Sequence, residues 1–161
     1  MSLSKTEKII GIILAILLLV VTLNSTFFFL GKLKVSVLDW VAFNSCAPTS
    51  FLYLSFFIVF LINKKATCLV LTSLPTFFLG TMSMFVLPWN GDYLFAHIGH
   101  IIMTLNLIWV FSIVLKHKNF KALAIGLLIG MLIFVPYIAY VQTYNQAHGS
   151  FIKPFIFNGN N

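Results

Sequence analysis

Five long apolar runs, separated by short polar segments, organise the chain. They lie at about residues 9–30, 47–63, 66–87, 93–115 and 122–141. A helix rises about 1.5 Å per residue, so roughly 20 residues cross a hydrocarbon core about 30 Å thick. The pattern predicts an all-α fold: a polytopic membrane helix bundle with five transmembrane helices, forming a single integral membrane domain over residues 1–161. The first run is too long for a secretory signal, and no convincing cleavage site follows it, so we expect a retained span.

Proline and turn residues mark the boundaries of several runs. Pro48 suits the first turn of the second helix. Pro75 lies inside the third run, where it predicts a bend, and Pro88 ends that run. Asp92 follows an Asn-Gly pair and is expected to cap the N-terminus of the fourth helix. The predicted helices are thus bounded by residues that break or cap helices.

Two polar segments are longer than simple turns. Residues 31–46, GKLKVSVLDWVAFNSC, mix charged side chains with apolar ones and are expected to lie along the membrane surface. Trp40 and Trp89 suit the headgroup region, where amphipathic rings are enriched. The tail, residues 145–161, places aromatic residues between polar ones. We expect this tail to fold back onto the interface or to dock on a partner.

The composition indicates that the chain belongs in a lipid bilayer. It is 60% hydrophobic and only 8% charged, and its mean hydropathy is +1.03. An ordinary soluble domain is nearer 25% charged, and a water-soluble fold of this size cannot hide so much apolar surface. The lipid bilayer is therefore the first expected partner. We expect an integral membrane protein of the cytoplasmic (plasma) membrane.

The charged residues predict the orientation. All ten basic residues are lysines, and the net charge is +7. Seven of them lie in segments that the five-helix topology places on one side of the membrane: Lys5, Lys8, Lys64, Lys65, Lys116, Lys118 and Lys121. Because lysines concentrate in cytoplasmic connections, the N-terminus is expected inside and the C-terminus outside. The positive charge then follows from topology, and no nucleic-acid partner is expected.

Two histidines stand near the head of the fourth predicted helix, in the segment DYLFAHIGHIIMTLN. With about 100° per residue, His100 lies about 60° from His97, and Thr104 only about 20°. The three share one face, in the outer third of the bilayer. An ionisable group at that depth needs a partner and is a functional hypothesis by default. The sequence thus predicts an outward-facing polar pocket lined by His97, His100, Asp92 and Thr104.

A transition metal ion is an alternative occupant of the same place. His97, His100 and Asp92 would suit zinc, nickel or cobalt. Thioether or thiolate ligands added to the histidines would suit copper(I), and the candidates are Met82, Met84 and Cys46. The HxxH spacing alone specifies no metal. A structural role also accounts for the pair, with each imidazole bonded to a carbonyl or threonine across a helix contact.

Three further residues are predicted to pack helices together. Asn106 lies about 180° from His97 on the same helix, so it faces a different neighbour and can bond to it. Gly126 and Gly130 form a GxxxG pair in the fifth run. That spacing lets another helix approach closely, within the chain or in a homo-oligomer.

Missing motifs narrow the function. The chain has no P-loop, GxSxG, HExxH or glycine-rich nucleotide fingerprint. We therefore favour a non-catalytic subunit, accessory or transport-type component, acting with a membrane-protein partner or as a homo-oligomer. One alternative is a metal-binding or metal-transport membrane protein for zinc, nickel or copper. Another is a membrane-embedded enzyme acting on a lipid or quinone, with a histidine as general base.

Overall fold

The structure is a computed structural model that describes the backbone of residues 1–157 and the side chains of residues 1–148, apart from that of Asp92. All its regular elements are helical. In chain order they are α1 (Lys5–Thr26), η1 (Phe27–Lys32), α2 (Val37–Phe43), α3 (Cys46–Asn63), α4 (Ala66–Val70), α5 (Ser73–Thr76), η2 (Phe77–Thr81), α6 (Ser83–Val86), η3 (Gly91–Tyr93), α7 (Leu94–Lys116) and α8 (Phe120–Phe157). Residues 158–161 lie outside the described part of the chain.

Five helical segments are long and apolar enough to cross a membrane. They are Lys5–Lys32, Cys46–Asn63, Ala66–Val86, Leu94–Lys116 and Phe120–His148. Each corresponds to one of the five apolar runs, which confirms the predicted all-helical class with five candidate spans. Large apolar side chains such as Val20 and Leu132 remain exposed on the outside of the bundle. These features indicate an integral membrane protein.

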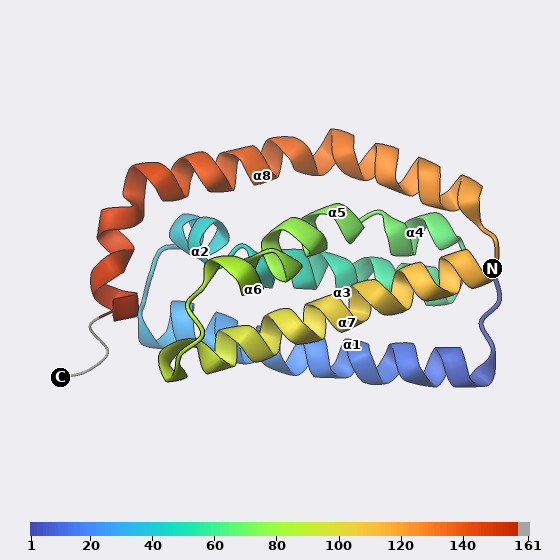
Figure 1. Ribbon diagram of the computed structural model, residues 1–161, viewed down its shortest axis with the longest axis horizontal. Coiled ribbons are helices and arrows are strands. Elements are labelled where there is room, and N and C mark those ends of the chain that lie inside the picture. Colours follow the sequence, from blue (N-terminus) through green and yellow to red (C-terminus); the bar gives the residue numbers. More distant parts are fainter. Residues whose placement is uncertain (158–161) are drawn as a thin grey trace.

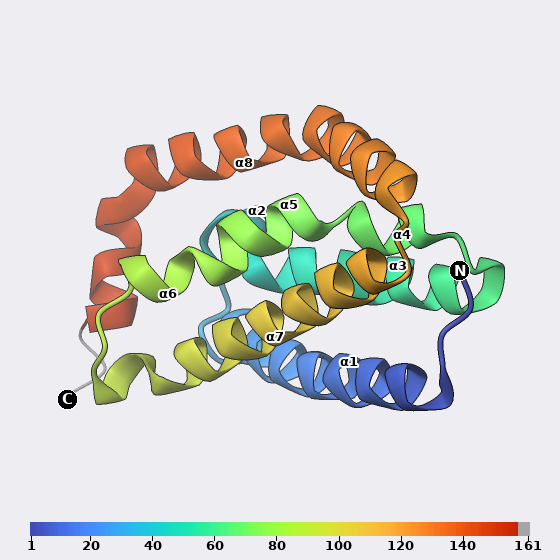
Figure 2. The ribbon, with the colours of Figure 1, turned by 45° about the vertical axis from the view of Figure 1, so that its right-hand side comes forward.

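The spans run lengthwise beside one another, with α8 along one side of the bundle over α4 and α5 (Figures 1 and 2). The main core lies between α1, α3, α4 and α7, where Leu18, Phe57 and Val110 are buried together. Gly11 of α1 lies directly against the indole of Trp109 on α7, and any side chain there would overlap that ring. The absence of a side chain at Gly11 therefore allows the first and fourth spans to pack closely.

The third span is interrupted rather than simply bent, which corrects the expectation of one helix over residues 66–87. Helix α4 ends at Val70, and Thr72 leaves helical geometry with φ −94° and ψ 4°. Pro75 has no N–H to bond the carbonyl one turn earlier, which accounts for the break. The Thr76 hydroxyl donates to the Thr72 carbonyl (2.7 Å), which also accepts from the Thr76 backbone N–H (3.1 Å). A π-helical stretch, η2, follows.

The fifth helix is longer than the sequence pattern predicted. It continues past residue 141 to Phe157, so residues 142–157 are helical. Polar side chains fasten this extension to the carboxylate and carbonyls of α2. Tyr144 Oη donates to Asp39 Oδ1 (2.8 Å), and Asn145 Nδ2 donates to the Ala42 carbonyl (3.2 Å). The prediction failed because hydropathy falls where these polar contacts begin, although the helix does not end there.

The segments that carry the seven flanking lysines are the start of α1, the α3–α4 turn and the α7–α8 turn, and they lie at one end of the bundle, the end that holds the N-terminus (Figure 1). Lys116 Nζ pairs with Glu7 Oε1 at 2.7 Å, joining the end of α7 to the start of α1. His117 Nε2 lies 3.3 Å from the other oxygen of that carboxylate. Ser4 completes a capping box with Glu7, which starts α1. The helix connections with the most positive charge therefore share one side of the bundle.

Candidate functional site

His97 lies in the first turn of α7 and is almost completely buried, at 2% exposure. Its Nε2 lies 2.9 Å from the carbonyl oxygen of Pro88. A carbonyl only accepts, so Nε2 carries the hydrogen and donates. In the neutral imidazole Nδ1 is then an acceptor, and it has no hydrogen-bond partner among the described residues. One ring nitrogen is thus hydrogen-bonded, and the other is buried without a partner among the described residues.

Trp89 covers His97 from the connection between α6 and α7. The two rings are nearly parallel, with centroids 4.0 Å apart and planes 10° apart. The indole Nε1 donates to the Met84 carbonyl at 2.9 Å, which ties the ring to the end of the third span. Trp89 itself is 68% exposed. It therefore forms a cover with one face on the imidazole and the other on the surroundings.

His100 lies one turn further along α7 and is 5% exposed. Its Nδ1 also lacks a partner in the described part of the chain. The Thr104 hydroxyl donates to the His100 carbonyl (2.8 Å) and lies 3.0 Å from the Thr81 hydroxyl of η2. The structure therefore brings His97, His100 and Thr104 onto one polar strip of α7 that faces the third span.

Next to this polar strip, α7 makes a tight contact with η2. Met103 is buried against Gly80, where an added Cβ would lie 2.7 Å from the methionine Cε. Gly80 therefore allows the irregular third span to approach the fourth. Apolar packing of Met103 therefore follows the histidines along α7, and Trp89 covers His97 on the other side.

Asp92 was predicted both as the N-cap of the fourth helix and as part of the pocket. The helix N-cap is Tyr93, without a side-chain cap bond, and Asp92 lies in the short 3₁₀ turn before it. The capping prediction is thus wrong, because the extra turn moves the start of α7 beyond Asp92. The side chain of Asp92 lies outside the described residues, so its place in the pocket stays a prediction.

The additional metal ligands considered for copper(I) have other surroundings. Cys46 Sγ donates to Asn44 Oδ1 (3.1 Å) at the start of α3. Met82 is exposed, and Met84 contributes its carbonyl to Trp89. Among the described side chains, no three from His, Cys, Asp or Glu gather closely enough to hold a metal ion. The structure thus shows no ligand set of His, Cys, Asp or Glu for a metal ion among those side chains.

The three predicted packing residues all lie at helix contacts. Asn106 is fully buried, and its Nδ2 donates across the bundle to the Leu14 carbonyl of α1 (3.2 Å). A Cβ on Gly126 would lie 2.7 Å from Val70 Cβ, and one on Gly130 would lie 2.6 Å from the Leu71 carbonyl oxygen. The glycine pair therefore places α8 directly against the end of α4, within the chain.

Sequence reasoning missed the role of Trp89, which was assigned only to the headgroup region. An available signal was its place directly after Pro88, in the short connection that leads back to the histidines. It also missed Gly80 and Thr81, because a π-helix changes which residues of the third span face α7. Buried hydroxyls of Thr72 and Ser73 at the interruption have no partner in the described region either.

Comparisons with known proteins assign the chain to no family. The chain matches no family model, no curated protein and no solved structure. Its function therefore has to be argued from the geometry of its own residues.

Proposed function

We propose that this chain is a non-catalytic membrane protein, an accessory or transport-type component, whose functional site is the His97–His100 pair beneath Trp89. One observation carries the proposal: both imidazoles are more than nine-tenths buried, yet the Nδ1 of each has no partner in the described structure. Leaving a buried polar atom unpaired costs about 1–3 kcal/mol. A ligand or partner that supplies the missing bonds removes that cost.

The tautomer defines the chemistry of the ligand. His97 donates through Nε2 to Pro88, so its Nδ1 offers a lone pair. The matching group is an N–H or O–H donor, carried by a small polar molecule or by a polar side chain of a partner helix. Trp89 is exposed on its outer face, and rotation of its side chain would open the path to His97.

The proposal includes the orientation. The lysine-rich end is cytoplasmic, so the histidine pair lies near the outer face of the plasma membrane and the C-terminus is outside. The supporting observation is that the segments carrying seven of the ten lysines lie at one end of the bundle (Figure 1). Ligands would then reach the pair from outside.

No structural observation specifically favours either alternative, a metal-binding protein or a membrane-embedded enzyme. A metal ion would need more ligands than the described side chains bring to the pair. A lipid- or quinone-directed enzyme would need a cleft in which an imidazole meets the substrate, and the two pockets described at the lysine-rich end contain neither histidine. The non-catalytic reading needs only the open hydrogen-bonding positions that the structure shows.

Photo-crosslinking tests this function in the native membrane. A photoreactive phenylalanine analogue replaces Trp89 in one variant and Phe120, an exposed aromatic residue at the opposite end, in a control. We expect position 89 to attach to a discrete ligand or partner, identified by mass spectrometry, and position 120 not to do so. Loss of that product on His100→Leu would tie it to the pair. Attachment to bulk lipid alone at both positions would contradict the proposal.

A further inference from the structure

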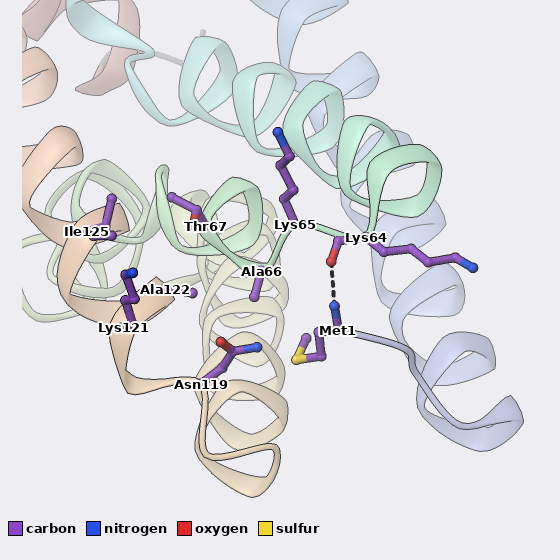
Figure 3. Close-up of a pocket in the computed structure, with 9 residues that line it drawn as sticks. All are labelled: Met1, Lys64, Lys65, Ala66, Thr67, Asn119, Lys121, Ala122 and Ile125. Atoms are coloured by element: carbon purple, nitrogen blue, oxygen red, sulfur yellow. Dashed lines mark hydrogen bonds between the residues drawn. The ribbon is translucent and has the colours of Figure 1, made fainter.

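A second candidate site lies at the lysine-rich end, far along the bundle from the histidines. It is a pocket of ≈ 360 Å³ between the α3–α4 turn and the start of α8 (Figure 3). Its polar lining consists of Lys64, Lys65, Thr67, Asn119, Lys121 and the N-terminal ammonium of Met1, which donates to the Lys64 carbonyl (2.6 Å). The remaining wall is mostly apolar, including Ala122 and Ile125. The pocket thus combines cationic and hydrogen-bonding groups with a surface suited to hydrocarbon.

The positive charge of this pocket is not neutralised within the described structure. No carboxylate lines it, and none of its three lysines has an ion-pair partner among the described residues. Glu7 is the acid at this end, and it is already engaged by Lys116 and His117. Three uncompensated lysines around one pocket favour an anionic occupant.

Lysines lie on two sides of the pocket, with the side chains of Lys64 and Lys65 directed outward from it (Figure 3). In Figure 3, Lys121 and Asn119 lie on one side and the Lys64–Lys65 turn on the other. The left-handed backbone of Lys64 (φ 57°) forms this turn, and the two lysine side chains leave it in different directions. Their long stems let the ammonium groups rotate toward a bound group. Thr67 and Asn119 add neutral donors.

We propose that this pocket binds a phosphate group, the natural source being the headgroup of an anionic phospholipid in the adjacent leaflet. Its place at the ends of the third and fifth spans sets it at headgroup depth, and the apolar wall beside α8 can contact an acyl chain. Basic pockets between transmembrane helices are a recognised arrangement for binding lipid headgroups. Free phosphate shares the recognition chemistry but does not use the apolar wall.

The test is lipid retention by the full-length protein, purified in neutral detergent and observed by native mass spectrometry. The protein is offered phosphatidylglycerol and phosphatidylcholine, and a separate arm measures thermal stabilisation by inorganic phosphate. The pocket variant is Lys64→Gln/Lys65→Gln/Lys121→Gln. The matched control, Lys5→Gln/Lys8→Gln/Lys118→Gln, removes the same charge at the same end, outside this pocket.

We expect the wild type and the control to prefer phosphatidylglycerol, and the pocket variant to lose on the order of tenfold or more of that preference. Stabilisation by phosphate that the pocket variant lacks would identify free phosphate as a second source; its absence would leave the lipid headgroup. Equal loss in both triple variants would overturn the proposal in favour of diffuse surface charge, and equal retention would overturn it outright. Circular dichroism checks folding, and Lys121→Gln alone serves if the triple variant does not fold.

Discussion

The indole of Trp89 stacks on the imidazole of His97, with ring centroids 4.0 Å apart and an interplanar angle of 10°. The stack joins a short connection to the first turn of a membrane-spanning helix. The hydrogen bond from His97 Nε2 to the Pro88 carbonyl satisfies that nitrogen of the covered imidazole. The cover and the open Nδ1 therefore belong to one arrangement, and changing the indole should change access to the histidine.

Trp89→Ala should expose His97 and lower stability. Aromatic pairs contribute about 0.5–1.5 kcal/mol beyond their buried area. We expect a lower unfolding temperature and faster carbethoxylation of His97, measured by peptide mass spectrometry. Trp89→Phe keeps a stacked ring and loses only the bond to the Met84 carbonyl, so it should react at nearly the wild-type rate. Unchanged reactivity in the alanine variant would show that Trp89 is not a cover.

Gly130→Ala should separate α8 from α4. The added Cβ would lie 2.6 Å from the Leu71 carbonyl oxygen, a backbone atom that cannot rotate away. Overpacking of this kind costs about 1–3 kcal/mol, measurable as a loss of unfolding free energy in detergent. Gly99→Ala is the matched control, since nothing lies within 4 Å of its Cβ position and alanine favours helix. A neutral Gly130→Ala variant would contradict the close approach.

Asn106→Leu should change stability by less than about 1 kcal/mol. The variant loses the 3.2 Å bond to the Leu14 carbonyl, and such interhelical bonds average about 0.6 kcal/mol. It also removes a buried Oδ1 that has no partner in the described structure, which offsets the loss. Asn106→Asp should be more destabilising than Asn106→Leu, because a carboxylate at a helix centre carries an insertion penalty of about 2.5–3.5 kcal/mol. A large cost for leucine in reversible unfolding would indicate an additional partner of Oδ1.

Tyr144→Phe should lower stability in a pH-dependent way. Hydrogen bonds from the hydroxyls of Ser36 and then Tyr144 hold the pKa of Asp39 below its ordinary value of 3.8. A depressed folded pKa contributes stability that is present above the unfolded value and lost as pH falls through the folded one. Asp39 is largely solvated, so we expect under about 1 kcal/mol at neutral pH. The difference from wild type should shrink below pH 3.8 in denaturant titrations; a constant difference would exclude the ionic contribution.

The spans were predictable because a membrane helix must bury its backbone bonds internally and expose apolar side chains, and both requirements appear in composition alone. The detail of the third span was not. Pro75 predicts an irregularity in the helix. Whether the chain bends there, breaks or widens into a π-helix depends on contacts with α7 and α8, such as those of Gly80 and Gly130. These contacts join residues that are far apart in sequence.

The candidate site, too, was predictable only in part. Helical periodicity placed His97, His100 and Thr104 on one face, and the structure has them there because all three lie on one uninterrupted helix. Periodicity cannot describe a connection between helices, so it missed Trp89 and misplaced the cap at Asp92. The start of a helix after a short 3₁₀ turn is determined by local backbone geometry rather than by hydropathy.

Labelling of single cysteines in intact cells tests the central claim, that the histidine pair and the lysine-rich end lie on opposite sides of the membrane with the lysines inside. In a Cys46→Ala/Cys68→Ala background, Gly91→Cys reports the connection before α7, and Lys118→Cys reports the turn after it. We expect a membrane-impermeant maleimide to label position 91 in intact cells and position 118 only after permeabilisation. Labelling of both positions from outside, or of position 118 alone, would contradict it.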